Sequence, residues 1–456
     1  MMLRLRRLHR LVERVKDIEV LLLAPPYKGM LREPVGLFYL ASVLMRNNIS
    51  ISILDLNLDR MGKREFHDYI KKASPKIIGI TSYTFNFYIA LDILNEIKKN
   101  HPGIITVLGG VHASAIPEDI LLKESSIDYI VIGEGEITFL ELCQKILLNE
   151  SCDNIEGLAY LEDKVRINPS RKPMKDLDSL GIPNRDLTNY FKYPVVSVQT
   201  SRGCPYNCIF CNICNYYEKT IRFRNPYTVV DECEALVKKH NYKNLYFFGD
   251  TFTFNKEWVE TFCDELIKRD IKFHWSCETR VDNVDRQILE KMKEAGCMMI
   301  QYGIDYGDDE VLKNLGKDFT IETIEEAVDL TKKSNIRAEA FFIFNCPGET
   351  QETIDNTYNL IQRLPLDAVE INLLTPYPGT KIGDDPESFN MRIINKEFWN
   401  YTTKKYLLEN ESFPRDKFIP AFRDLLKRLN LVSFGRTPEI FNFLEKEKKI
   451  KTWSDG

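Results

Sequence analysis

Short apolar runs alternate with amphipathic stretches from about Ile18 to Asn149. Stretches such as 35–47 and 88–100 repeat their apolar residues at helical spacing. Five runs are nearly continuous in apolar, often β-branched residues: 19–23, 50–54, 76–80, 104–108 and 129–132. Strands of this kind, separated by helices, indicate a parallel sheet covered on both faces. The pattern predicts an α/β domain, doubly wound and Rossmann-like, over residues 18–150, with its ligand beyond the carboxyl ends of the strands.

This rhythm stops over residues 151–190, which hold prolines and mixed charge and are expected to be a linker with one small hairpin at most. A second alternation begins at Val195. Its six expected strands are 195–200, 244–249, 272–276, 299–304, 338–344 and 368–374. Because a helical pattern follows each strand, we predict a partial (β/α)6 barrel over residues 191–385, with chemistry at the carboxyl ends of its strands.

The two ends of the chain lack this alternation. Residues 386–456 show no strand pattern and are rich in aromatics, so a C-terminal helical region is expected. Residues 2–16 carry six Lys or Arg, with apolar residues at helical spacing, and predict a basic helix over 1–17. That helix fits either a membrane surface or, more simply, packing of one apolar stripe on the next domain.

Composition narrows the class of protein. The 456 residues are 44% hydrophobic and 28% charged, which excludes a mostly disordered chain. With 62 Lys and Arg against 67 Asp and Glu, the net charge of −5 argues against nucleic-acid binding. No apolar run reaches the ~18 residues that a membrane span needs. The eleven cysteines form no paired framework, so a reducing, cytoplasmic location is expected.

The strongest chemical signal is the triplet Cys204, Cys208 and Cys211, spaced C-x3-C-x2-C in the loop after the first barrel strand. Iron–sulfur cubanes normally take four thiolates, so three leave one iron open to a chelating substrate. A structural zinc knot with Cys214 as fourth ligand is the alternative. The six β-α units weigh against that alternative, and Cys214 is expected to be a bystander.

The triplet, with Phe210 before its last cysteine, resembles that of the radical S-adenosylmethionine (SAM) enzymes. The later segments similar to this family are RFRNP (222–226), ETRVD (278–282), GID (303–305), PGET (347–350) and PYPGT (376–380). The earlier ones are similar to its cobalamin-binding branch: LAPPY (23–27), VGLFYLA (35–41), GGVH (109–112) and GEGE (133–136). Together the resemblance covers about residues 18–385. It implies three cofactors: a [4Fe-4S] cluster, SAM and cobalamin.

The resemblance also implies roles at the SAM site. The open iron would bind the amino and carboxylate groups of SAM, and Phe210 would lie along the adenine. Asp305 stands where relatives usually carry Glu, and it would bond SAM or simply cap the following helix. Asp250 has the same two interpretations. Arg280 would pair with the SAM carboxylate or form a structural salt bridge.

For the cobalamin domain, the resemblance assigns corrin contact to Gly109, Gly110 and Gly133, where a bare backbone can approach a flat ligand. For Glu134 and Glu136 the resemblance also implies corrin contact. Both begin a helix, however, where negative charge is favourable even without any ligand. His112 lies after the fourth strand, whereas the cobalt-ligating histidine of the family pattern follows the first. We therefore expect His112 to be a hydrogen-bonding loop residue and no histidine below the cobalt.

The implied function is a cobalamin-dependent radical SAM C-methyltransferase acting on an unactivated carbon through a 5′-deoxyadenosyl radical and methylcobalamin. The alternatives are a non-methylating oxidative cyclase or ring-rearranging enzyme, and a non-catalytic cobalamin sensor. The expected partners are a small-molecule or peptide substrate and an electron donor such as flavodoxin or ferredoxin. Cys346 departs from the family's usual Gly and is either a hydrogen-atom donor or, more simply, a small buried hydrophobe.

Overall fold

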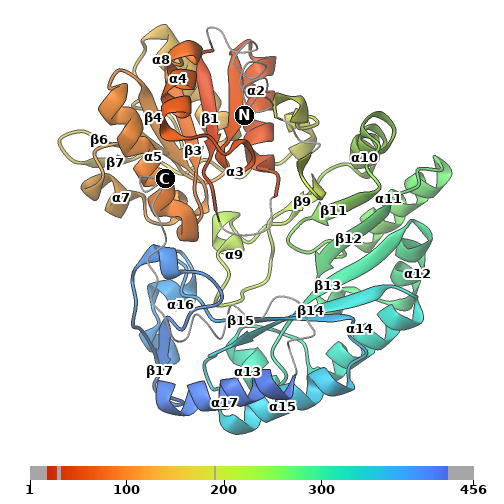
Figure 1. The fold of residues 1–456 in the computed structure, drawn as a ribbon. Coiled ribbons are helices and arrows are strands. Elements are labelled where there is room, and N and C mark those ends of the chain that lie inside the picture. Colours follow the sequence, from red (N-terminus) through yellow and green to blue (C-terminus); the bar gives the residue numbers. More distant parts are fainter. Residues whose placement is uncertain (1–17, 28–31, 189–191, 430–456) are drawn as a thin grey trace. The chain divides into compact units, whose positions relative to one another are not determined.

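The computed structural model describes residues 18–27, 32–188 and 192–429. The basic helix expected at 1–17 lies outside the described residues. The chain divides into two compact units that meet in sequence between Pro194 and Val195 (Figure 1). Among the helices within the described ranges, none combines the length and apolar character that a membrane span requires.

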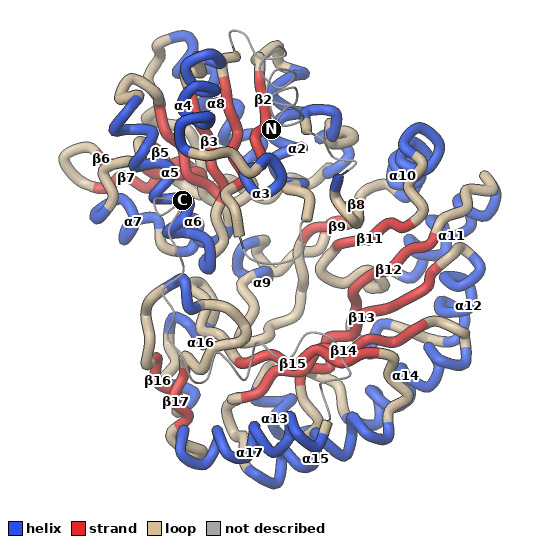
Figure 2. Tube along the Cα trace, viewed as in Figure 1, coloured by secondary structure: helices blue, strands red, loops and turns tan. Residues whose placement is uncertain are grey.

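The first unit is built on a seven-stranded sheet in the order β2-β1-β3-β4-β5-β6-β7 (Figure 2). Its strands are β1 (Val20–Ala24), β2 (Ile51–Asp55), β3 (Ile77–Thr81), β4 (Ile105–Gly109), β5 (Tyr129–Val131), β6 (Leu158–Leu161) and β7 (Val165–Ile167). The first five are parallel, as predicted, because their nearly continuous apolar sequences are buried on both faces. The strand order reverses between β1 and β3, and a ligand of such a sheet is expected at the carboxyl ends of its parallel strands.

Helices cover both faces of this sheet (Figure 2). They are α2 (Val35–Arg46), α3 (Leu56–Asp59), α4 (Lys63–Ala73), α5 (Phe87–Asn100), α6 (Val111–Ala115), α7 (Pro117–Lys123) and α8 (Gly135–Leu148), with 3-10 turns η1 (Thr84–Asn86), η2 (Leu177–Leu180) and η3 (Arg185–Leu187). The apolar side of α5, for example, buries Ile93, Leu94 and Ile97. The amphipathic spacing of the sequence thus places each helix on the sheet.

The hairpin expected within 151–190 consists of β6 and β7, and both strands extend the first sheet in antiparallel order. The rest of that segment also packs on the first unit. Arg185 forms a buried ion pair with Glu33 at 3.2 Å, and the Tyr193 hydroxyl donates to Asp55 at 2.5 Å. Residues 151–194 are therefore part of the first compact unit.

The second unit holds a six-stranded, fully parallel sheet in the order β15-β14-β13-β12-β11-β8, which curves as an open half-barrel (Figure 1). Its strands are β8 (Val196–Gln199), β11 (Asn244–Phe248), β12 (His274–Thr279), β13 (Cys297–Asp305), β14 (Arg337–Phe344) and β15 (Ala368–Leu373). The six predicted strands are confirmed in chain order. A two-stranded pair, β9 (Ser201–Arg202) and β10 (Arg222–Phe223), flanks the loop after β8.

Helices such as α10, α11, α12 and α14 line the outer face of the half-barrel (Figure 2). The helices of this unit are α9 (Ile213–Tyr216), α10 (Pro226–His240), α11 (Lys256–Lys268), α12 (Arg286–Glu294), α13 (Asp309–Asn314), α14 (Ile321–Lys333), α15 (Gln351–Arg363), α16 (Lys381–Asp384) and α17 (Arg415–Arg428), with 3-10 turns η5 (Val281–Asn283), η6 (Glu387–Phe389) and η7 (Phe398–Asn400). Trp275 of β12 lies at the centre of this core, with its ring 6.1 Å from that of Phe262 on α11.

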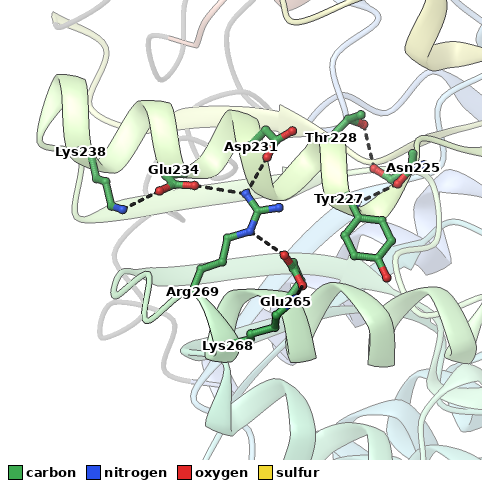
Figure 3. Close-up of polar contacts among 9 residues, drawn as sticks. All are labelled: Asn225, Tyr227, Thr228, Asp231, Glu234, Lys238, Glu265, Lys268 and Arg269. Atoms are coloured by element: carbon green, nitrogen blue, oxygen red, sulfur yellow. Dashed lines mark hydrogen bonds and ion pairs between the residues drawn. The ribbon is translucent and has the colours of Figure 1, made fainter.

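Polar contacts join neighbouring helices of this outer layer (Figure 3). The Arg269 guanidinium, at the end of α11, donates to Asp231 at 2.6 Å and to Glu234 at 3.2 Å, both on α10. It also donates to Glu265 of α11 at 2.7 Å. Because these groups face water, the network orients the helices more than it stabilises the fold.

The C-terminal region corrects one expectation, since it is not helical throughout. Strands β16 (Met391–Ile393) and β17 (Leu408–Asn410) form an antiparallel pair before α17. Three-residue strands are too short to leave a periodic pattern, which explains why the sequence did not reveal them. The aromatics of the region build an ordinary core: the Phe422 ring of α17 lies 5.4 Å from that of Phe344.

Candidate functional site

The cysteine triplet lies in the loop between β9 and α9, at the carboxyl end of the barrel sheet (Figure 1). None of the three forms a disulfide bond, and each residue is partly exposed. The loop begins at Gly203, whose φ is +92° and where a Cβ would come within 1.9 Å of the Thr220 carbonyl oxygen. No residue with a side chain fits there without a backbone shift.

The thiols are suited to bind iron together. Burial raises the pKa of Cys211 to about 12, and the neighbouring Cys208 and Cys204 also raise it. A thiol in this setting loses its proton only when a cation takes its place. Within the described residues, no three His, Cys, Asp or Glu side chains are close enough together to hold a single metal ion. A cubane takes one thiolate on each of three irons, which the three cysteines of this loop can supply.

Asp250 holds the start of this loop. Its carboxylate accepts a hydrogen bond from the Gly203 backbone N–H at 2.7 Å. Burial raises the pKa of Asp250 to about 6, although the Gly203 bond opposes the rise. The observed contact is thus a structural one that links the end of β11 to the cysteine loop.

Arg280 shows the structural salt bridge that was one of its two expected roles. Its guanidinium donates to both oxygens of Asp282, at 2.9 and 2.8 Å, and lies 3.5 Å from the ring centre of Tyr206 in the cysteine loop. Nη1 is buried and has no hydrogen-bond partner among the described residues. A carboxylate of a bound ligand would satisfy this donor.

Asp305 forms a buried ion pair that the sequence did not reveal. It is the last residue of β13, with φ of +70°, and its partner is the Lys317 ammonium. Lys317 also donates to the Gly303 carbonyl at 3.3 Å and lies 5.7 Å from the ring centre of Phe210. No sequence pattern pointed to this pair, since Lys317 stands between Gly316 and Asp318, outside any apolar period.

The inner face of the half-barrel carries a polar row that sequence reasoning also missed. Glu278, Gln301 and Glu339 occupy adjacent register positions on β12, β13 and β14. Gln301 Nε2 donates to Glu339 at 2.6 Å, and the Tyr246 hydroxyl donates to Glu278. Their neighbours along each strand are buried against the helices, so alternation directs these side chains to the opposite face.

In the first unit, the expected ligand-binding glycines differ from one another. A Cβ on Gly110, whose φ is +99°, would lie 2.5 Å from the Ser82 carbonyl oxygen, so the fold itself requires this glycine. Gly133, with φ of +76°, has nothing within 4 Å of such a Cβ. Gly109 is ordinary, with its closest atom at 3.9 Å. Gly133 is thus the position whose bare backbone leaves room for a flat ligand.

Glu134, directly after Gly133, has a partner within the first unit. Its carboxylate accepts a hydrogen bond from the Met174 backbone N–H at 2.8 Å. The residue precedes α8 without capping it through its side chain. This contact attaches the segment after the β6–β7 hairpin to the end of β5.

His112 is buried on the short helix α6 and not in a loop. Its Nδ1 lies 3.1 Å from the Thr84 hydroxyl, as a hydrogen-bonding residue should, and its ring packs 4.5 Å from that of Phe87. Burial lowers the pKa of His112 to about 4, so the ring is neutral at pH 7. Nearby, Ser82 Oγ is buried after β3 without a hydrogen-bond partner among the described residues. Such an orphaned hydroxyl fits a site for a ligand with polar groups.

Comparisons with known proteins agree with this geometry. The family model of the radical SAM superfamily matches residues 198–361, and that of the B12 binding domain matches residues 29–143. An uncharacterized methyltransferase of Pyrococcus horikoshii is 30% identical over 439 residues, which cover 93% of this chain and 94% of the relative. The anaerobic magnesium-protoporphyrin IX monomethyl ester cyclase of Rubrivivax gelatinosus is 30% identical over 383 residues, or 79% of this chain and 68% of that protein.

A solved structure shares the whole architecture. The radical SAM methyltransferase TsrM of Kitasatospora setae, with cobalamin and a [4Fe-4S] cluster bound, superimposes with a TM-score of 0.76. The match covers 90% of this chain and 89% of that one, at 19% sequence identity. At this identity the likeness establishes the fold, including the order of the two units along the chain.

Proposed function

Because this chain belongs to the cobalamin-binding family of radical SAM enzymes, we propose that it is a C-methyltransferase that acts on an unactivated carbon. The carrying observation is that a complete cysteine triplet and a B12 binding domain occur in one chain. A relative named as a methyltransferase, aligned over 93% of the chain, supports the same reaction class. When bound, the cluster and SAM supply a 5′-deoxyadenosyl radical, and cobalamin supplies the methyl group.

The residues of the barrel unit would divide the work of holding the cluster and SAM. Cys204, Cys208 and Cys211 would ligate three irons and would leave the fourth open. Arg280 would bind the SAM carboxylate, which is supported by its buried Nη1, an atom without a hydrogen-bond partner among the described residues. Phe210 would lie along the adenine. Asp250 would hold the cysteine loop through Gly203, and Asp305 would hold Lys317 through their ion pair.

In the first unit, the carboxyl ends of β3, β4 and β5 would hold cobalamin. Gly133 leaves open space for the corrin, whereas Gly110 shapes the turn against Ser82. The Ser82 hydroxyl supplies a hydrogen bond to a polar group of the ligand. His112 stays neutral and bonded to Thr84 through Nδ1. Because it follows the fourth strand and not the first, it would not ligate cobalt.

The proposed partners are a small-molecule or peptide substrate and a one-electron donor of the flavodoxin or ferredoxin class. The polar row of Glu278, Gln301 and Glu339 gives the inner face of the barrel hydrogen-bonding groups for a polar substrate. A cytoplasmic location accords with the ten cysteines that the structure describes, none of which forms a disulfide bond.

An oxidative cyclase of the same architecture is the second candidate, and the 30% identity to the Rubrivivax gelatinosus cyclase favours it. A non-catalytic cobalamin sensor is the third, but a sensor has no need for a complete triplet.

A substrate-free experiment separates these candidates. Anaerobically reconstituted protein, loaded with cobalamin and reduced with titanium(III) citrate, is incubated with SAM that carries a 13C-labelled methyl group. A methyltransferase is expected to pass the label to the cobalamin extracted from the protein and to form S-adenosylhomocysteine. Deoxyadenosine formation without label in the cobalamin would replace this proposal with the cyclase, and no SAM turnover at all would favour the sensor. Cys204→Ala/Cys208→Ala/Cys211→Ala protein is the control for radical cleavage.

A further inference from the structure

The segment after α13 lies directly against the cysteine loop. The Ile209 backbone N–H donates to the Leu315 carbonyl at 3.1 Å. Next to it, Cys208 Sγ lies 3.9 Å from the Gly316 carbonyl oxygen. A Cβ on Gly316 would come within 2.7 Å of the Asn207 carbonyl oxygen, so the two backbones approach as closely as a glycine permits.

Lys317, the next residue, brings a buried charge to this contact. Its side chain is 6% exposed, as is that of its partner Asp305. The ammonium faces the ring of Phe210, two residues from Cys208, at 5.7 Å from the ring centre, and that of Phe319 at 5.6 Å. The ammonium is paired with the Asp305 carboxylate, so the pair brings one positive and one negative charge into this interior.

The contact of the pair with the cysteine loop runs through Lys317. Its ammonium faces Phe210 of that loop, and the preceding residue, Gly316, lies against Cys208. We therefore take Lys317 as the member nearer to the cysteine loop. Charge in a water-poor interior acts over several ångströms with little screening.

We propose that the buried Lys317–Asp305 pair is a positioning element that tunes the reduction potential of the cluster, with Lys317 favouring the reduced form. Reduction adds one electron from an external one-electron donor and takes up no proton, so the cluster becomes one unit more negative. A fixed cation beside Cys208 stabilises that added charge, and a nearby anion opposes it. The proposal rests on the cluster assignment alone and does not depend on methyl transfer.

The test is a redox titration of the reconstituted holoenzyme without SAM, followed by electron paramagnetic resonance, after iron content has been measured. Lys317→Met is expected to shift the midpoint potential to more negative values, and Asp305→Asn to more positive values. Lys313→Met, an exposed lysine on α13, is the matched control and should leave the potential unchanged. A role confined to packing would lower iron content or stability without producing shifts of opposite sign.

The double variant Lys317→Met/Asp305→Asn guards against misfolding, because it leaves no lone buried charge. It is expected to hold iron and to show a negative shift smaller than that of Lys317→Met, since Lys317 is the nearer member. Shifts of the same sign in the two single variants, or an unchanged potential in the double variant with a full complement of iron, would overturn the proposal. Failure of all variants and of the unmutated protein to bind iron would instead refute the cluster assignment.

Discussion

Asn345 and Asn410 form reciprocal hydrogen bonds between the segment after β14 and β17. Asn345 Nδ2 donates to the Leu408 carbonyl at 2.8 Å, and Asn410 Nδ2 donates to the Cys346 carbonyl at 2.9 Å. Both asparagines are 1% exposed. Asn345 follows β14 with φ of +65°, a conformation that asparagine tolerates better than most residues. The reciprocal bonds attach β17 to the carboxyl end of the barrel sheet, where the PGET segment begins.

Asn410→Ala should destabilise the second unit, because it leaves the buried Cys346 carbonyl without this donor. The expected loss is about 1–3 kcal/mol in the free energy of unfolding. Asn356→Ala is the control, since Asn356 is exposed on α15. Denaturant unfolding of both variants checks this, and equal stability of the two would show that the asparagine pair contributes nothing.

Glu349, in the same segment, should make stability depend on pH. Burial raises its pKa to about 8 from the ordinary 4.5, although it accepts hydrogen bonds from the backbone N–H groups of Asn345 and Cys346. Because the folded state keeps this proton to higher pH than the unfolded state, stability falls as pH rises between these values. The limiting slope is about 1.4 kcal/mol per pH unit.

Glu349→Gln should remove that slope. The difference in thermal stability between the variant and the unmutated protein is expected to change in favour of the variant as pH rises from 5 to 8. Glu352→Gln, at an exposed position, should behave like the unmutated protein. Parallel stability curves for Glu349→Gln and the parent across this range would show that Glu349 is not held protonated.

The cysteine triplet should bind the iron. Anaerobically purified protein is expected to be brown with about four irons per chain. Cys204→Ala/Cys208→Ala/Cys211→Ala should hold none and should not cleave SAM. Cys346→Ala should keep its iron, because that thiol is buried and donates to the Ile343 carbonyl at 3.3 Å. Stoichiometric zinc, with no iron after reconstitution, would contradict the cluster.

His112 should not ligate cobalt. Bound cob(II)alamin is expected to show no nitrogen hyperfine splitting from histidine in its paramagnetic resonance spectrum. His112→Ala should leave that spectrum unchanged, because His112 follows β4, whereas the cobalt-ligating histidine of the family pattern follows the first strand. Loss of an axial nitrogen signal in the variant would place the ligand at His112 after all.

Substitutions at Gly110 and Gly133 should have different effects, because the fold requires a glycine at position 110 and cobalamin binding requires one at position 133. Gly110→Ala forces a methyl group against the Ser82 carbonyl and should markedly destabilise the first unit. Gly133→Ala meets open space and should cost only the ~1–2 kcal/mol of a left-handed residue, yet it should weaken cobalamin binding. Thermal unfolding without cobalamin and equilibrium binding of hydroxocobalamin measure the two effects. Unchanged cobalamin affinity in a folded Gly133→Ala protein would rule out close corrin contact there.

Local patterns in the sequence were enough to predict both parallel sheets. In the first unit, the five apolar runs are buried strands whose ends lie within one residue of the expected positions. In the second unit, the largest difference is at β12, which was expected at 272–276 and is observed at His274–Thr279. Strand and helix periods are visible in windows of a few residues, and so is the spacing of Cys204, Cys208 and Cys211. The same locality explains the missed pair β16–β17, whose strands are too short to show a period.

The contacts that give the site its character depend on residues far apart in the chain. Lys317 forms an ion pair with Asp305, twelve positions earlier in the chain. Asn410 donates to the Cys346 carbonyl, 64 positions away. The backbone of Ser82, which follows β3, leaves no room for a side chain at position 110. Neither a periodic pattern nor a motif records the distance between such groups. The sequence alone determined the order of the elements, the cysteine triplet and the family resemblance, because each depends on local spacing. Which charge lies beside the cysteines, and which glycine has open space, was decided only when tertiary packing brought distant side chains and backbones together.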